Sequence, residues 1–181
     1  MMIVRRNFAA IKVKQTTRAL TNNLKVKNYI NGEFVQSEAN EWINIFNPAT
    51  QEIIGHVPCS TQSELLRAEQ GAAEAFKTWR EVPVQQRQRV FFALQALIKE
   101  HTEELALSIT TEQGKTLPDA RGDVFRGLEV VEMASSIGHL IMGETQENLS
   151  KGLDTYSYRQ PLGVTAGICP FNFPAMVSRQ P

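Results

Sequence analysis

One side-chain amide lies among apolar residues in the last part of the sequence. Asn172 stands between Phe171 and Phe173, directly after an apolar run that ends at Pro170. An asparagine amide can donate hydrogen bonds to negative charge in a dry pocket. It can equally cap a helix, and Pro174 favours the first turn of one. The residues alone leave both roles open for Asn172.

A second candidate is Arg126, which precedes Gly127 inside a helical pattern. Glycine in a helix costs about 1 kcal/mol relative to alanine, so its presence indicates close packing at this turn. A guanidinium binds a carboxylate through two parallel hydrogen bonds, which suits recognition of a carboxylate group. The alternative is a surface arginine that pairs with Glu129.

The cysteines and histidines predict neither a disulfide framework nor a metal site. The chain has two cysteines, and its histidines lie far apart without the spacing of metal ligands. Cys169 lies in an apolar run, and we expect burial there to suppress its reactivity as a nucleophile. Cys59 follows a predicted strand, where we expect a small packed residue.

The elements that must position these residues begin with short strands. Residues 28–35 predict a hairpin, because Asn31-Gly32 is the preferred pair of a type I′ turn and apolar residues flank it. Residues 43–60 predict a strand, a turn at Asn47-Pro48 and a second strand that ends near Pro58.

Helices follow the strands. Thr61 and Glu64 have the spacing of a capping box, and apolar residues recur at helical intervals after them. Pro83 opens a second helix, which we expect to break and resume near Thr102. A third long helix is predicted from about Asp119 to Met142.

Two different strands are expected after the helices. Residues 154–160 alternate between apolar and polar types, which predicts an exposed strand. Residues 162–169 form a continuous apolar run, which is typical of a buried parallel strand. Gly163 and Gly167 in this run do not form the G-x-G-x-x-G fingerprint, so no phosphate-binding loop is predicted.

The net charge of zero hides a basic N-terminal segment. Seven of the 19 lysines and arginines precede Glu33, the first acidic residue, which leaves 12 basic against 19 acidic residues, about −7, in the body. Such a segment predicts a mitochondrial transit peptide over residues 1–24, the alternative being a basic arm that binds acidic partners. The acidic body argues against nucleic-acid binding, and no apolar run is long enough to span a membrane.

Several motifs together resemble the aldehyde dehydrogenase superfamily. In the order of that family's N-terminal region, over about residues 27–177, they are NYINGEFV, NPATQEIIGHVP, AAEAFKTW, TTEQGKTLPDARGDVFRGLEVVE and PFNFPAM. The phenylalanine at position 171 resembles the pattern of the CoA-acylating branch, the methylmalonate-semialdehyde dehydrogenases. Many other branches have a tryptophan at this position, before the asparagine.

The resemblance implies an α/β fold class, the N-terminal portion of the aldehyde dehydrogenase fold. Small β-hairpins, a helical layer, an oligomerisation strand and the first strand of an incomplete Rossmann-like sheet are expected. Residues 25–181 are then the N-terminal part of the NAD-binding domain, truncated.

The resemblance also implies roles for the candidate residues. Asn172 matches the amide that stabilises the oxyanion formed when an active-site thiolate attacks an aldehyde, with Phe171 and Phe173 excluding water. Arg126 matches the residue that pairs with the substrate carboxylate. The segment implied to line the nicotinamide cofactor is Ile168, Cys169, Pro170 and Phe171.

The implied enzyme oxidises a small semialdehyde with NAD, releases CO₂ and transfers the acyl group to CoA in the mitochondrial matrix. We expect it to be a homo-oligomer, a tetramer, assembled through strands such as residues 154–160. The family's catalytic cysteine and general-base glutamate belong to later motifs, so we expect the 181 residues alone to be inactive and residues 161–181 to pack poorly. The alternatives are a non-catalytic subunit that co-assembles with a longer chain, and a fragment of another aldehyde dehydrogenase branch.

Overall fold

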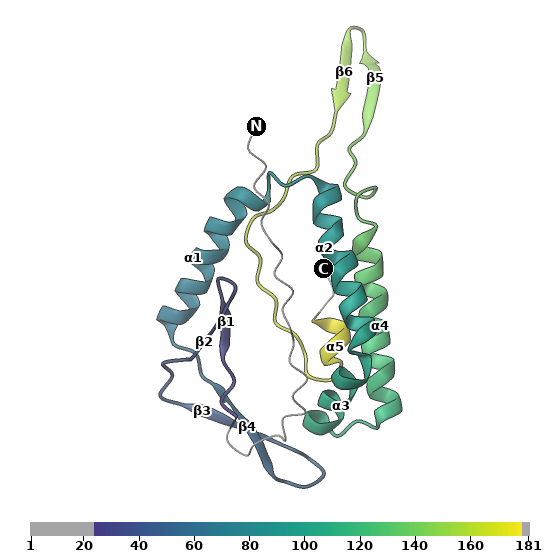
Figure 1. The fold of residues 1–181 in the computed structure, drawn as a ribbon. Helices are drawn as coiled ribbons and strands as arrows, with labels where there is room; N and C mark the ends of the chain where they lie inside the picture. Colours follow the sequence, from purple (N-terminus) through teal and green to yellow (C-terminus); the bar gives the residue numbers. More distant parts are fainter. Residues whose placement is uncertain (1–23, 179–181) are drawn as a thin grey trace, which may run out of the picture.

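The computed structural model describes residues 24–178, so the transit-peptide prediction falls outside the described residues except at Leu24. The described part contains short strands, a set of long helices and a final helix of one turn (Figure 1). In chain order the elements are β1 Asn28–Ile30, β2 Glu33–Val35, β3 Trp42–Phe46, β4 Ile53–Pro58, α1 Gln62–Trp79, α2 Val84–Glu100, α3 Thr102–Gln113, α4 Leu117–Ser135, β5 Thr145–Ser150, β6 Leu153–Tyr156 and α5 Pro174–Val177.

The strands of the described residues form three separate antiparallel pairs, β1 with β2, β3 with β4 and β5 with β6. Asn31 and Gly32 join β1 to β2 with φ angles of 54° and 84°, the two positive values that a type I′ turn requires. The predicted hairpin is therefore confirmed. The second predicted pair is confirmed as well, with Trp42 opposite Pro58 at its open end.

The helix boundaries follow local signals in the sequence. Thr61 caps α1, and Glu64 returns the hydrogen bond to the backbone of Thr61, which confirms the predicted capping box. α2 begins after Pro83, and α3 begins after a break at His101. α3 ends at Gly114, whose φ of 75° is a left-handed helix terminus.

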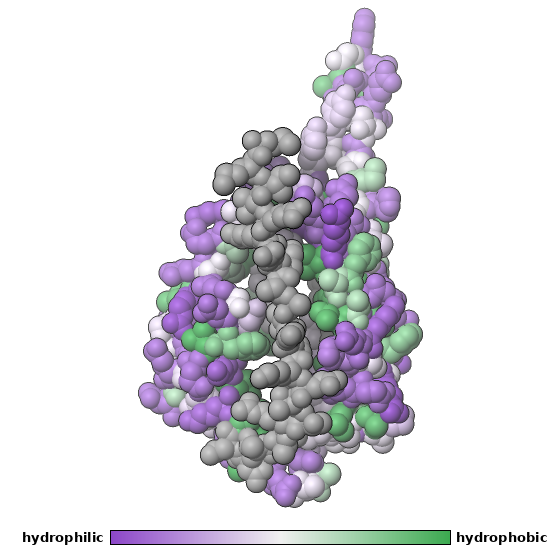
Figure 2. All heavy atoms as spheres, in the orientation of Figure 1, coloured by the Kyte–Doolittle hydropathy of each residue, from purple (hydrophilic) through white to green (hydrophobic). Residues whose placement is uncertain are grey.

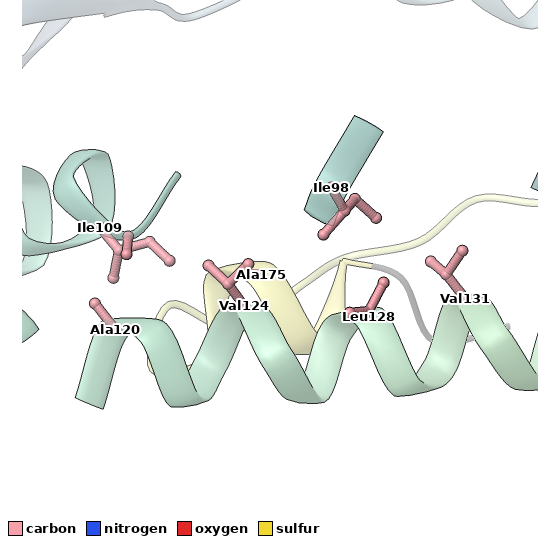
Figure 3. Packing of buried hydrophobic residues seen from close by; sticks show 8 residues of the cluster. Ile98, Ile109, Ala120, Val124, Leu128, Val131 and Ala175 are labelled. Atoms are coloured by element: carbon pink, nitrogen blue, oxygen red, sulfur yellow. The ribbon is translucent and has the colours of Figure 1, made fainter. Parts of the chain in front are cut away.

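The hydrophobic core lies around α4. Figure 3 shows the side chains of Val124, Leu128 and Val131 along one side of this helix, facing residues of α2, α3 and α5. Val124 is 1% exposed and is the largest fully buried side chain. The complete cluster is Ile98, Ala106, Ile109, Ala120, Val124, Leu128, Val131 and Ala175.

The predicted end of the third long helix needs correction. α4 ends at Ser135, and residues 136–141 continue as turns instead of reaching Met142 as helix. The hydroxyl of Ser135 donates to the carbonyl of Glu132 at 2.6 Å, and that of Ser136 donates to the carbonyl of Met133 at 2.7 Å. Serine side chains that bond the backbone in this way compete with continuation of the helix.

The predicted exposed strand is shorter than expected and has an unpredicted partner. β6 is fully exposed and ends at Tyr156, and it pairs with β5, a polar segment without an alternating pattern. The two strands project from the end of the helical part as a ribbon (Figure 1).

The prediction of a buried parallel strand over residues 162–169 is wrong for this structure. These residues form neither helix nor strand, and all except Gly163 are exposed. A parallel strand needs neighbours for its backbone hydrogen bonds, and none of the described strands pairs with this segment. The expectation of poor packing over residues 161–181 is confirmed for residues 161–172, which are exposed except for Gly163, and is wrong for α5, whose Ala175 is buried.

Apolar surface remains exposed around the described elements. Leu65 and Leu66 of α1 are 61% and 47% exposed, and Leu97 of α2 is 52% exposed. Figure 2 shows apolar residues at the surface beside α2 and near the β1–β2 hairpin. Within the described range, the helices are too short or too polar to cross a membrane.

Candidate functional site

The two segments that carry Arg126 and Asn172 meet in the structure. α5 lies against α4, and Ala175 of α5 is next to Val124 of α4 (Figure 3). The backbone N–H of Met176 donates a 3.0 Å hydrogen bond to Oδ1 of Asp123. The contact joins residues 53 positions apart and fixes the segment that follows Asn172 to the helix that bears Arg126.

Lys115 contacts both segments of this region. Lys115 Nζ lies 3.5 Å from Asp123 Oδ2, and the Asp123 side chain is completely buried. The same Nζ lies 4.3 Å from the ring centroid of Phe173, which is a cation–π distance. Lys115 therefore touches both the carboxylate on α4 and the aromatic residue that follows Asn172.

Asn172 is exposed, and its side chain makes no hydrogen bond to the described residues. The N-cap of α5 is Phe173, with no side-chain cap. The alternative in which Asn172 caps this helix is therefore wrong. Among the described residues, the two N–H donors of the amide have no acceptor.

Arg126 is exposed on α4 and forms no ion pair with the described residues, so the alternative in which it pairs with Glu129 is absent from this part of the chain. Arg126 follows Asp123 by three residues, which places the two about 60° apart around the helix. Gly127 is buried, as its position in a packed helix predicted.

The segment predicted to line the cofactor is an open surface. Ile168 is fully exposed and Phe171 is 86% exposed, so the expectation that Phe171 excludes water is wrong within the described residues. Cys169 is also exposed, which contradicts the expected burial. Phe173 is half-buried under Lys115 and is the aromatic neighbour of Asn172 that packs.

The exposed segment fits a nicotinamide in its chemistry. The apolar side chains of Ile168 and Phe171 offer the kind of surface on which a flat ring packs. An open groove of about 590 Å³ lies elsewhere, between α1 and the β1–β2 turn, and is lined by Asn31, Gly32, Gln70, Gly71, Glu74 and Ala75. None of its lining residues is a predicted site residue.

Asp123 and Lys115 were not among the site residues predicted from the sequence. The signal for Asp123 was its place in an apolar stripe: Ala120, Asp123 and Gly127 recur at helical spacing, and all three are buried. A carboxylate on the buried face of a helix requires a partner. The sequence carries no similar signal for Lys115, because this residue lies in the turn between α3 and α4, where no helical periodicity applies.

Comparison with known proteins gives the family. The model of the aldehyde dehydrogenase family matches residues 34–180. The chain belongs to the aldehyde dehydrogenase family. The family and the fold class predicted from the sequence motifs are thereby confirmed.

Three relatives illustrate which aldehyde dehydrogenases the chain is similar to. It is 55% identical over 152 residues to the Homo sapiens methylmalonate-semialdehyde/malonate-semialdehyde dehydrogenase [acylating], mitochondrial, covering 84% of this chain and 28% of that protein. The solved methylmalonate-semialdehyde dehydrogenase of Oceanimonas doudoroffii superposes with a TM-score of 0.83 at 40% identity, covering 86% of this chain and 32% of that one.

The third relative contains the cofactor. A Sinorhizobium meliloti structure that carries the same enzyme name was solved with NAD bound, and it superposes with a TM-score of 0.81 at 41% identity. The match covers 87% of this chain and 32% of that chain. The chain thus spans about a third of the length of the aldehyde dehydrogenases it matches.

Proposed function

We propose that these residues form the N-terminal part of an NAD-dependent, CoA-acylating methylmalonate/malonate-semialdehyde dehydrogenase. The observation that carries the proposal is the 55% identity with the human enzyme of that name over 152 residues. The contact between α4 and α5 supports it, because it places the segment that follows Asn172 against the helix that carries Arg126.

In this proposal Asn172 stabilises the oxyanion. When a thiolate attacks the aldehyde carbon, the carbonyl oxygen becomes negatively charged, and the Asn172 amide donates a hydrogen bond to it. The exposed Asn172 has N–H donors that the described residues do not use. One such donor contributes about 3–4 kcal/mol to the transition state, or about 10²–10³ in kcat.

Arg126 binds the carboxylate of the semialdehyde. Its guanidinium is exposed and forms no ion pair with the described residues, so it offers two parallel N–H donors to an incoming carboxylate. A branch that acts on uncharged aldehydes gains nothing from a cation at this position.

The proposal includes NAD as the cofactor and CoA as a co-substrate. NAD, when bound, accepts the hydride from the substrate carbon, and the Sinorhizobium meliloti structure contains NAD. Ile168, Cys169, Pro170 and Phe171 form the exposed surface that we assign to the nicotinamide side. CoA takes up the acyl group as a co-substrate, and no residue of this chain is assigned to it.

The finer parts of the proposal concern location and assembly. Residues 1–24 act as a transit peptide to the mitochondrial matrix, and residues 25–181 belong to the NAD-binding domain. The exposed β5–β6 ribbon joins copies of the enzyme into a tetramer. A polypeptide of these 181 residues alone is inactive, because the thiolate and the general base come from later motifs.

A chimera tests the activity. Residues 27–177 replace the corresponding segment of the human enzyme, and acyl-CoA formation is measured with methylmalonate semialdehyde, NAD and CoA. We expect turnover comparable to that of the human enzyme, and about 10²–10³-fold lower kcat for Asn172→Ala. An inactive, folded chimera, or an Asn172→Ala variant with unchanged kcat, would contradict the proposal.

Substrate choice tests Arg126 separately. In the chimera, Arg126→Met is expected to raise KM for methylmalonate semialdehyde and to leave KM for propionaldehyde, which has no carboxylate, unchanged. Equal losses on both aldehydes would show that Arg126 does not recognise the carboxylate.

The 181-residue polypeptide tests the remaining claims. We expect no reduction of NAD by this polypeptide with either semialdehyde, and measurable reduction would overturn that claim. Co-purification of the inactive polypeptide with a full-length copy would favour the alternative role as a non-catalytic subunit. The exposed β5–β6 ribbon supports this alternative, because its strands can pair with another copy.

A further inference from the structure

Asp123 is a buried carboxylate in the middle of a helix, where packing alone would favour an apolar residue. Its side chain is completely buried, while Ala120 and Val124 beside it belong to the hydrophobic core. Burial of a carboxylate is unfavourable unless hydrogen bonds and an opposite charge compensate for it. The partners of Asp123 therefore indicate what the residue does.

Both partners involve the segment that carries Asn172. Asp123 Oδ1 accepts the backbone N–H of Met176 at 3.0 Å. Asp123 Oδ2 lies 3.5 Å from Lys115 Nζ, and that ammonium lies 4.3 Å from the centre of the Phe173 ring. Ala175, between the two contacted residues, is buried in the core.

These contacts are made by Phe173 and Met176, which follow Asn172 by one and four residues. Asn172 itself makes no side-chain hydrogen bond to the described residues, so its position is set by what holds Phe173 and Met176. A displacement of about 1 Å at a reacting group can cost about 10²-fold in rate. A fixed backbone on this side is therefore a requirement for an amide that must reach an oxyanion.

We propose that Asp123 and Lys115 are positioning residues that fix residues 173–176 to α4 and thereby hold Asn172 in place for the oxyanion. This inference rests on the proposed role of Asn172 and adds two residues to it. Asp123 supplies the acceptor and the negative charge, and Lys115 bridges that charge to the aromatic neighbour of Asn172. Neither residue touches the reacting atoms.

A double-mutant cycle in the chimera tests the inference. Asp123→Ala removes the acceptor of the Met176 N–H, and we expect at least a tenfold lower kcat per titrated active site with an unchanged KM for the semialdehyde. In the Asn172→Ala background the same change is expected to lower kcat by less than twofold, because the group that Asp123 positions is gone. A loss of kcat that is equally large in both backgrounds would overturn the inference.

Conservative variants separate positioning from loss of folding. Asp123→Asn keeps an oxygen for the Met176 N–H, and Lys115→Arg keeps a cation over Phe173, so both are expected to retain more kcat than Asp123→Ala and Lys115→Met. Glu129→Ala, an exposed carboxylate on the same helix, is the matched control and should leave kcat unchanged. Equal kcat for Lys115→Met and the parent would exclude Lys115 from the role.

Hydrogen exchange gives a readout that needs no activity. In the 181-residue chain, Asp123→Ala is expected to increase the exchange rate of the Met176 amide at least tenfold, with the amides of α2 unchanged. Unchanged exchange at Met176 would overturn the inference.

The kcat values distinguish failure of the proposed function from failure of the inference. The proposed function fails if Asn172→Ala leaves kcat unchanged. The inference alone fails if Asn172→Ala lowers kcat and Asp123→Ala does not.

Discussion

α1 and α4 have nearly the same length, 18 and 19 residues, yet they are held in the molecule in opposite ways. α4 buries seven residues, four of them in the hydrophobic core. α1 buries a single residue, and that residue is the carboxylate Glu64. One helix is held mainly by apolar packing, and the other mainly by hydrogen bonds to one side chain.

Glu64 joins α1 to two other segments. Its carboxylate accepts hydrogen bonds from the backbone N–H of Thr61 at 2.8 Å, from that of Glu38 at 3.1 Å and from the hydroxyl of Ser37 at 3.0 Å. Asn28 of β1 adds a longer contact at 3.5 Å. The N-terminus of α1 and the chain around Ser37 thus depend on one group.

Asp123 plays a similar part on α4, but with apolar support. It accepts one backbone N–H from α5, and Ala175 of α5 is buried beside it in the core. In both regions a buried carboxylate holds a distant segment, while the amount of apolar burial decides how costly the loss of that carboxylate becomes.

The largest expected difference between the two helices comes from matched leucines. Leu128→Ala in α4 removes a side chain that is 7% exposed and leaves a cavity, so the free energy of unfolding should fall by about 2–5 kcal/mol. Leu65→Ala in α1 changes a side chain that is 61% exposed and should alter it by less than about 0.5 kcal/mol. Urea denaturation of the 181-residue chain measures both.

A similar loss of stability from the two leucine substitutions would contradict the claim that apolar packing stabilises α4 far more than α1. It would mean that the exposed face of α1 is covered in solution, so that its stability also depends on apolar burial. Leu66→Ala, at a position 47% exposed, is a second control on the same helix.

The sequence predicted those features whose signals lie close together in the chain. Asn31-Gly32 sets its own turn, and Thr61 and Glu64 cap α1 across three residues. The contact from Asp123 to Met176 spans 53 residues, and no local pattern encodes it. The same is true of the Glu64 contacts to Ser37 and Glu38.

The wrong predictions share a physical cause. Residues 162–169 have the composition of a buried strand, but composition supplies no neighbours for the backbone, and the described strands do not pair with it. β5 is a strand because β6 pairs with it, although its own residues show no alternation. For Arg126 and Asn172, the sequence indicated the residue types, and the structure added the lysine and aspartate that connect their segments.

The loss of stability on substitution of Glu64 should be smaller than that of Leu128→Ala, and it should depend on pH. Hydrogen bonds, first among them that from the Thr61 backbone, lower the pKa of Glu64 from 4.5 to about 2. Because the unfolded carboxyl has the higher pKa, the stability that Glu64 contributes is complete above pH 4.5 and is lost as pH falls toward 2. The difference in unfolding free energy between the parent and Glu64→Gln should therefore shrink across that window.

Glu69→Gln, an exposed position on the same helix, is the matched control and should show no such pH-dependent difference. Hydrogen exchange should localise the effect of Glu64→Gln to β1, β2 and the first turn of α1, with the α4 amides protected as before. If the α4 amides lose protection equally, the two regions unfold as one unit and the contrast between them fails.

The smallest expected effect probes where α1 meets the β1–β2 turn. A Cβ added to Gly71 would collide with the side-chain amide of Asn31, which would have to turn away, so Gly71→Ala alone should gain less stability than the helix propensity of alanine supplies. With Asn31→Gly, which suits the positive φ of that position, the collision disappears. Gly71→Ala should then stabilise the chain by about 0.5–1 kcal/mol. The measurement is the unfolding free energy of the four variants, and an equal effect of Gly71→Ala in both backgrounds would show that the turn does not rest on α1.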